Sequence, residues 1–204
     1  MHVPSAFAQT NLTTLFDFIE EHSFALLVSQ ADGHPVASHR PLLLDRDAAP
    51  HGRLVGHMAR ANKQWAEASE EVPAIFSRPH TYISPTWYES EKVVPTWNYL
   101  ARHAYGILHI VDERPRLIEI VRDFVDFYEA SLPRPWSIED VDDQFVDGLV
   151  DRIVGFHIDI TGIEGKWKLN QNQPASRRKK VAGHLSARDD ENSLAIAKLM
   201  EEML

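Results

Sequence analysis

Hydrophobic and polar positions alternate with two different periods along this chain. Near its start, apolar residues recur at the spacing of one helical face and predict a helix over residues 12–21, with Leu12, Leu15, Phe16 and Ile19 on that face. Thr10 or Asn11 can cap its first turn. Apolar stretches separated by Gly, Pro and Asp then follow at residues 24–29, 36–44 and 54–59. Short strands at such close intervals favour a meander or a Greek key over alternating βαβ units.

The middle of the chain predicts more strands. Asn62 can cap a short helix through residue 70, and residues 72–77 and 81–84 have strand character. Residues 97–111 predict one long strand or a bent pair, because side chains such as Tyr99 and His109 alternate with apolar ones such as Leu100 and Leu108. Two such faces fit a barrel wall whose outer side is covered. A further strand is predicted over residues 153–160.

Helices are predicted outside the strands. Pro115 is well placed to begin one that continues through Tyr128, and Ser137 can cap another with Ile138 and Phe145 on its apolar face. We expect a single domain over residues 1–204, with a helical excursion at about 115–150 and a C-terminal helix at about 190–204.

Composition and charge narrow the class of protein. The 204 residues are 44% hydrophobic and 25% charged, which is typical of a folded soluble chain. Cysteine is absent, so disulfides, zinc ribbons, iron–sulfur clusters and thiol nucleophiles are excluded. The first residues lack the basic region and apolar run of a signal peptide, and no apolar run is long enough to span a bilayer. We therefore expect a cytoplasmic protein with no membrane partner.

The charge is unevenly distributed. The formal net charge is −9, and residues 112–151 hold twelve acidic and four basic side chains. Residues 166–188 hold seven basic side chains and no acidic one. The basic cluster at residues 177–180 is expected in a solvated loop. DNA stays a possible partner, but the acidic balance argues against unaided binding to a phosphate backbone.

Several chemistries are excluded by missing motifs. The sequence holds no G-x-G-x-x-G, complete phosphate loop, G-x-S-x-G or H-E-x-x-H, which disfavours dehydrogenases, kinases, serine hydrolases and zincins of the usual types. Of the eleven histidines, six fall in or beside strands: His39, His57, His80, His103, His109 and His157. Because none has a second ligand at regular metal-site spacing, we expect no metal site.

Three polar and aromatic segments stand out. Residues 56–65 run from strand into helix, where amide donors beside Arg60, Asn62 and Lys63 can hold a phosphate; a capped helix that packs its Trp is the alternative. Residues 77–88 and 94–99 hold two Trp and three Tyr, which suit a flat heteroaromatic ring or an ordinary core. Residues 166–174 contain four consecutive carboxamides, which suit oxygen acceptors or a solvated loop.

At these segments the sequence resembles the PaiB family of FMN-binding split-barrel proteins, which are transcriptional regulators. The matching pieces, in unbroken order over nearly the whole chain, are Val-Pro-Ser-Ala-Phe at 3–7, Gly-His-Met-Ala-Arg-Ala-Asn at 56–62, Gln-Trp at 64–65, Pro-His at 79–80, Tyr-Ile-Ser-Pro-Thr-Trp-Tyr at 82–88, Val-Pro-Thr-Trp-Asn-Tyr at 94–99, His-Ala-Tyr-Gly at 103–106 and Lys-Leu-Asn-Gln-Asn at 168–172. Five positions depart from the family pattern: Arg40, Lys63, Arg78, Arg102 and Asn170.

The resemblance implies a mainly β, α+β fold: a six-stranded Greek-key split β-barrel with peripheral helices, paired as a homodimer with FMN at the seam between subunits. Arg40 falls where the superfamily often places a phosphate-binding Arg, and Lys168, Gln171 and Asn172 match a signature that suits a contact across the dimer. The implied cofactor-binding residues are His39, Arg40, Pro41, Leu42, His57, Met58, Ala59, Arg60, Asn62, Lys63, Trp65, His80, Tyr82, Trp97, Lys168, Gln171 and Asn172.

The implied function is that of an FMN-binding transcriptional regulator, with no catalytic residue assigned. The same barrel hosts pyridoxamine-phosphate oxidases and flavin reductases, so a flavin-dependent oxidoreductase with His80 or Tyr82 as proton donor stays open. A haem-handling protein is a third alternative, because the histidines are numerous and related barrels degrade haem.

Overall fold

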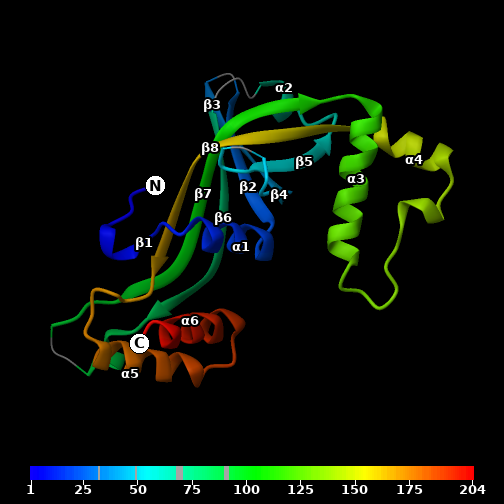
Figure 1. Cartoon of the computed structure of the whole chain (residues 1–204). Helices are drawn as coiled ribbons and strands as arrows, with labels where there is room; N and C mark the ends of the chain where they lie inside the picture. Colours follow the sequence, from blue (N-terminus) through cyan, green and yellow to red (C-terminus); the bar gives the residue numbers. More distant parts are fainter. Residues whose placement is uncertain (32, 49, 68–70, 90–91) are drawn as a thin grey trace. The chain divides into compact units, whose positions relative to one another are not determined.

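The computed structural model describes the chain except residues 32, 49, 68–70 and 90–91 (Figure 1). The chain divides into two compact units: unit 1 comprises residues 1–18, 75–103 and 164–204, and unit 2 comprises residues 19–74 and 104–163. The prediction of a single domain stays a prediction. No helix among the described residues combines the length and the apolar character that crossing a bilayer requires.

Unit 2 contains most of the short strands. They are β2 (Phe24–Ala31), β3 (His34–Pro41), β4 (Leu43–Asp45) and β5 (Arg53–Ala59), accompanied by the helices α2 (Gln64–Glu67), α3 (Arg114–Glu129) and α4 (Asp143–Val150) and the 3-10 turn η3 (Ile138–Asp140). Parts of three long strands complete it: β6 (Glu71–Ile83), β7 (Thr96–Val111) and β8 (Ile153–Lys168). Its core includes Leu27, Leu42, Leu54, Met58, Phe156 and Ile158, all fully buried.

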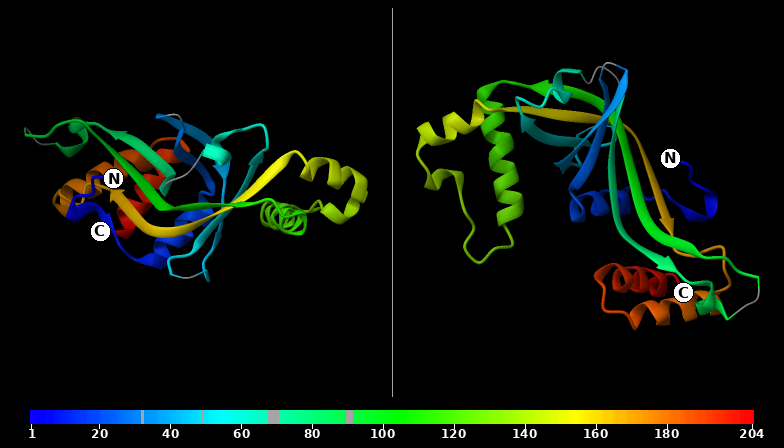
Figure 2. Two further views of the ribbon diagram at one scale, coloured as in Figure 1. Left: turned by 90° about the horizontal axis from the view of Figure 1, so that it is seen from above. Right: turned by 180° about the vertical axis from the view of Figure 1, so that it is seen from behind.

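Unit 1 combines the other parts of β6, β7 and β8 with helices. It holds η1 (Ser5–Phe7), β1 (Ala8–Gln9), most of α1 (Leu12–Glu21), η2 (Pro85–Tyr88), α5 (Ala175–Ser186) and α6 (Glu191–Glu202). Helices α5 and α6 lie side by side in each view (Figures 1 and 2). Val181, Leu185, Ile196 and Met200 are buried on them, because two short helices can hide their apolar faces against each other.

The sheet is antiparallel wherever its register is defined. Along the hydrogen-bonded path the strand order is β3-β2-β6-β7-β8-β5-β4, and β1 pairs with β8 beside this path. In β2 and β3, Ala25 lies opposite Arg40, and in β5 and β8, His57 lies opposite Gly155. The described residues form eight strands where six were expected, and β1 and β4 are only two and three residues long. The predicted α+β class is confirmed.

Two predicted elements are confirmed closely. The first helix covers the predicted residues, and Asn11 caps it by accepting a 3.0 Å hydrogen bond from the Thr14 amide. Residues 97–111 form one continuous strand, β7, in which Leu100, Ala104 and Leu108 are buried while Ile107 and His109 are exposed. The two-faced pattern in the sequence therefore predicted the orientation of residues 103–109 correctly, whereas Ala101 is buried and Ile110 is exposed against that pattern.

Other boundaries differ for identifiable reasons. The strand predicted over 36–44 ends at Pro41, because the Leu42 amide turns to the Ser23 carbonyl oxygen at 2.9 Å. The strands predicted over 72–77 and 81–84 are one strand, β6, in which the consecutive exposed residues Ser77 and Arg78 shift the alternation of buried side chains by one. The predicted helix after Ser137 is two elements, since Asp142 caps a separate α4 at Phe145.

Two segments predicted outside regular structure lie within it. Strand β8 continues eight residues beyond the predicted end, because Lys166 and Gly165 pair with Ala8 and Gln9 of β1. The basic cluster at 177–180 was expected in a loop, and this prediction is wrong: it lies in α5. The short helix predicted through residue 70 is described only as α2, because its last predicted residues, 68–70, lie outside the described part.

Arg102 is a charged side chain in the core of unit 1. It is fully buried, with its guanidinium carbon 4.7 Å from the centre of the Phe18 ring and 5.3 Å from that of Trp167. Its Nη2 donates to the Thr14 carbonyl oxygen at 3.3 Å, whereas Nε and Nη1 have no partner among the described residues. Burial lowers the pKa of Arg102 to about 9, against a smaller opposing effect of Asp17. The charged form is therefore destabilised by folding.

We expect Arg102→Met to raise the free energy of unfolding by about 1–3 kcal/mol. The depressed pKa means that Arg102 binds its proton more tightly in the unfolded chain than in the folded one. The cost of burying the charged side chain is therefore fully present at neutral pH, where Arg102 is charged in both states. This cost falls as the pH rises above about 9. Urea unfolding at pH 7 measures the effect. A loss of more than 1 kcal/mol in the variant would instead mean that the guanidinium has a strong partner in the native assembly.

Candidate functional site

Two buried nitrogen atoms without partners mark the first candidate site, in unit 2. Arg40 lies on β3 and His57 on β5, and Arg40 Nε and His57 Nδ1 are both buried with no hydrogen-bond partner among the described residues. Burial lowers the pKa of both side chains, and the charge of Arg40 lowers that of His57 further. Because an unsatisfied buried donor costs about 1–3 kcal/mol, such a pair suits an acceptor supplied by a ligand.

The surroundings hold the His57 ring in place. Phe124 of α3 meets it edge-on, with ring centres 5.0 Å apart. The predicted neighbours divide by exposure: Leu42 and Met58 are fully buried core residues, Pro41 is half-buried, and His39 and Ala59 are exposed. His39 stacks on Phe24 with ring centres 5.9 Å apart. Leu42 and Met58 thus belong to the wall beneath the site.

The corner after β5 is tied to the β2–β3 hairpin. Asn62 caps α2 by accepting from the Gln64 amide at 3.1 Å, and its side-chain amide donates to Ser38 Oγ at 3.2 Å. The buried Gln64 Nε2 donates to the Leu27 carbonyl oxygen and to Ser29 Oγ. Since α2 has only four residues, and the Gln64 and Ala66 amides already have acceptors, the helix start itself offers no anion site. Asn62 and Gln64 serve here to position the corner.

Arg60 is engaged at this corner by other groups. Its guanidinium donates to Asp112 Oδ1 at 2.6 Å and to the Asp151 and Ile153 carbonyl oxygens, and Trp65 Nε1 donates back to the Arg60 carbonyl oxygen at 3.0 Å. The Asp112 hydrogen bond raises the pKa of Arg60. A phosphate would have to compete with these acceptors for the Arg60 guanidinium. Lys63, the other predicted cation at this corner, is exposed to solvent. Arg40 is the better phosphate candidate of the predicted cations in unit 2.

The second set of predicted residues lies in unit 1 and begins with three aromatic rings. Trp97 of β7 is 52% exposed and lies against His80 and Tyr82 of β6, with ring centres 6.1 and 5.9 Å apart. Tyr82 is also exposed, at 43%. Exposed aromatic side chains that lie against one another suit a flat ligand or another protein surface.

The carboxamide segment after β8 is an ordered turn. Lys168 Nζ donates to the Trp97 carbonyl oxygen at 2.8 Å, and burial lowers its pKa, with a smaller effect of Lys166. Asn170 has a φ of 63°, a conformation that Asn tolerates, and donates to Tyr88 Oη at 2.8 Å. Gln171 closes the turn by accepting from the Leu169 amide and donating to the Trp167 carbonyl oxygen. The predicted loop is thus rigid at Gln171, whereas Asn172 is exposed.

Lys168 also lines a small cavity in unit 1. The cavity has a volume of about 200 Å³, and Tyr88, Thr96, Asn170 and Asn172 are among its other lining residues. Side chains such as Lys168, Asn172 and Thr96 can donate hydrogen bonds to oxygen acceptors there. Of the predicted residues, the turn therefore brings Lys168 and Asn172 to one cavity.

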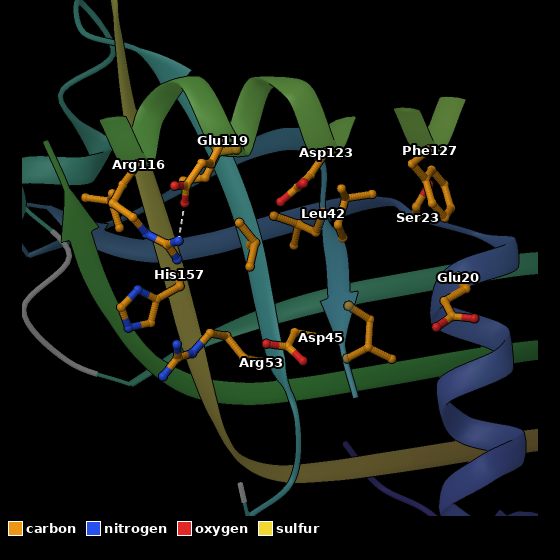
Figure 3. Close-up of a pocket in the computed structure, with 15 residues that line it drawn as sticks. Glu20, Ser23, Leu42, Asp45, Arg53, Arg116, Glu119, Asp123, Phe127 and His157 are labelled. Carbon is orange, nitrogen blue, oxygen red and sulfur yellow. Dashed lines mark hydrogen bonds and ion pairs between the residues drawn. The ribbon is translucent and has the colours of Figure 1, made fainter. Parts of the chain in front are cut away.

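Unit 2 contains a larger pocket that the sequence did not reveal. Its volume is about 490 Å³, and Figure 3 shows α3 side chains facing β4 and β5 across it. Acidic side chains outnumber basic ones on its walls, which include Glu20, Asp45, Glu119, Asp123, Arg53, Arg116 and His157. Burial raises the pKa of Asp123, and the charges of Asp126 and Glu119 raise it further. Of the predicted residues, Leu42 lines this pocket.

A titratable cluster also forms across neighbouring strands of unit 2. His109 of β7 stacks on His157 of β8, with ring centres 4.9 Å apart, and Asp159 lies two residues beyond His157 on the same face. Asp159 accepts from Arg53 Nε at 2.7 Å, and this bond lowers the pKa of Asp159. The alternation of His157 and Asp159 in the sequence was the available signal, but the pairing of β7 with β8 is what brings His109 to them.

Comparison with known proteins identifies the family. Residues 1–162 match the family described as "Putative FMN-binding domain". The chain is 34% identical to the "Protease synthase and sporulation protein PAI 2" of Bacillus subtilis over 206 residues, which cover 100% of this chain and 98% of that protein.

Solved structures agree on the fold. A flavocytochrome of Azotobacter vinelandii superposes with a TM-score of 0.61 at 14% identity, over 95% of this chain and 78% of that one. An FAD- and haem-binding protein of Mycobacterium smegmatis superposes with a TM-score of 0.51 at 16% identity, over 79% and 73% of the two chains. At these identities the likeness shows the split-barrel fold alone. The chain belongs to the PaiB-type family of FMN-binding split-barrel proteins.

Proposed function

We propose that this chain is an FMN-binding, homodimeric regulator of the PaiB type, in which Arg40 and His57 hold the phosphate of the flavin nucleotide. Family membership supports FMN as the cofactor. The observation that carries the placement is the pair of buried, unpartnered nitrogen atoms, Arg40 Nε and His57 Nδ1. A phosphate offers several strong acceptors, and a guanidinium is the side chain best suited to bind it.

The two side chains have different tasks at such a site. Arg40 supplies the charge, whereas the lowered pKa of His57 favours a neutral imidazole, which can donate from Nδ1 and still give little repulsion to Arg40. Leu42 and Met58 are fully buried in the core of unit 2. When bound, FMN supplies reversible acceptance of a hydride or of single electrons. The residues named here bind and orient the nucleotide.

We further propose that two copies pair and that the exposed aromatic set of unit 1 takes part in the seam. Trp97 and Tyr82 offer apolar area beside polar groups, and Lys168 and Asn172 offer donors at a neighbouring cavity. A flavin at such a seam would regulate only if it favours one arrangement of the pair over another. The name of the Bacillus subtilis relative, a sporulation protein, supports a regulatory role.

Direct contact with DNA is the weaker part of this role. Two basic side chains of α5 already have partners elsewhere in the chain. Lys180 forms an ion pair with Glu89, and Arg178 donates to the Met203 carbonyl oxygen. Lys179 is exposed. We therefore propose that the flavin state and the pairing of chains carry the signal.

Titration of FMN into the purified protein tests the proposal. We expect saturable quenching of flavin fluorescence with one FMN per chain, and a dimer by light scattering. Absence of binding up to high micromolar FMN, or haem binding with a Soret band and no FMN binding, would remove it. Rapid oxidation of NAD(P)H by the flavin-loaded protein would identify an oxidoreductase in place of a regulator.

A further inference from the structure

His109, His157 and Asp159 are arranged as metal ligands. His109 Nε2 lies 3.5 Å and His157 Nε2 lies 3.8 Å from the same atom, Asp159 Oδ2. One ligand atom from each of the three residues lies within 4.8 Å of the others. All three residues belong to unit 2, and the strands β7 and β8 that hold them are neighbours in the sheet. Rigid strands, and not a loop, therefore present the three groups.

The separations suit a bound cation better than hydrogen bonds. A histidine nitrogen that donates to a carboxylate lies about 2.7–2.9 Å from it, whereas these nitrogens lie at 3.5 and 3.8 Å. A tetrahedral ion with bonds of about 2.0–2.1 Å holds its ligand atoms roughly 3.3 Å apart. The two nitrogen-to-Oδ2 distances, 3.5 and 3.8 Å, exceed that spacing by about 0.2 and 0.5 Å.

A neighbouring group prepares one of the ligands. Arg53 donates to Asp159 Oδ1 and so leaves Oδ2 for the ion, in the way that an outer partner orients a ligating carboxylate.

We propose that His109, His157 and Asp159 bind one divalent transition-metal ion of the zinc type through Nε2, Nε2 and Oδ2. Two imidazoles and one carboxylate are ligands for Zn²⁺, Co²⁺ or Fe²⁺, whereas Mg²⁺ and Ca²⁺ prefer oxygen ligands. Three protein ligands leave a coordination position open for water or for another ligand. His157 and Arg53 also line the 490 Å³ pocket, so the site lies at the edge of that pocket.

Calorimetric titration of chelator-treated protein with Zn²⁺ tests the site. We expect one ion per chain, and the same protein titrated with Co²⁺ should develop visible absorption of the intensity typical of four-coordinate cobalt. His109→Asn should weaken binding at least about 100-fold, because it removes a ligand from an exposed position without disturbing the core. Mg²⁺ should not compete at millimolar concentration.

The matched control is His34→Asn, which removes an exposed histidine from β3 in the same unit. It should bind Zn²⁺ like the native chain. Asp159→Asn, checked for folding by circular dichroism, provides a second ligand variant that should also lose the ion. Equal affinity in the native chain and in His109→Asn would show adventitious binding by other histidines and overturn the proposal. Repeating the titration with and without FMN separates this site from the flavin site.

Discussion

Arg40→Gln is expected to weaken FMN binding by about 100-fold, or about 3 kcal/mol. The variant keeps a polar side chain of similar length but removes the charge and the guanidinium that would pair with the phosphate. The substitution also relieves the burial of an unpaired donor, so the free protein should be as stable as the native chain or slightly more stable. Fluorescence titration of FMN together with thermal unfolding measures both quantities.

Arg152→Gln is the matched control, because Arg152 is an exposed arginine of the same unit. It should bind FMN with unchanged affinity. The placement at Arg40 would be wrong if both variants lost the same small amount of affinity, since that result would indicate only a change in net charge. Riboflavin, which lacks the phosphate, should bind the native chain and the Arg40 variant almost equally.

Gly106→Val is expected to destabilise the protein by about 3 kcal/mol or more, and often to prevent its accumulation in folded form. A Cβ at Gly106 would lie 2.4 Å from the Asp159 carbonyl oxygen and 2.6 Å from Ile158 Cγ2. The first of these is a backbone atom of the neighbouring strand, which cannot move aside without disturbing the sheet. Chemical denaturation, or the soluble yield where no folded protein remains, reports the effect.

Gly183→Ala separates steric conflict from a general effect of replacing glycine. Gly183 lies inside α5, and nothing approaches an added Cβ within 4 Å. Because alanine is a better helix former than glycine, the free energy of unfolding of this variant should be about 0.5–1 kcal/mol higher than that of the native chain. If Gly106→Val proved as stable as the native chain, the close packing of β7 on β8 described here would be incorrect.

Local patterns predicted those elements whose partners are near in sequence. The first helix and its Asn11 cap follow from residues within one turn, and the two faces of residues 103–109 in β7 follow from the alternation there. The ends of β8 and the separation of β3 from β4 could not be predicted, because they depend on pairing with Ala8 and Gln9 and on a hydrogen bond to the Ser23 carbonyl oxygen. Boundaries set by distant partners leave no local signal.

The candidate site shows the same division. The resemblance implied that Arg40, His57 and Asn62 bind the cofactor. Only the structure distinguishes Arg40, whose Nε has no partner among the described residues, from Arg60, whose guanidinium pairs with Asp112. The histidine cluster was missed, because His109 and His157 are 48 positions apart in the sequence and meet only when β7 and β8 lie together. The acid-rich pocket was missed in the same way. In the sequence, the negative charge of residues 112–151 is what a solvated helix surface would also show, and the pocket forms only when α3 faces β4 and β5.

Neither compact unit is a contiguous piece of chain, because unit 1 draws on three segments and unit 2 on two. No single cut can therefore release either unit intact, and a fragment that ends inside β6, β7 or β8 loses material from both. Truncation is consequently a poor way to test the Arg40–His57 site and the histidine cluster, which both lie in unit 2, and point substitutions in the intact chain are the appropriate tool. The interleaving also predicts that a protease which nicks one of these strands abolishes both binding activities together.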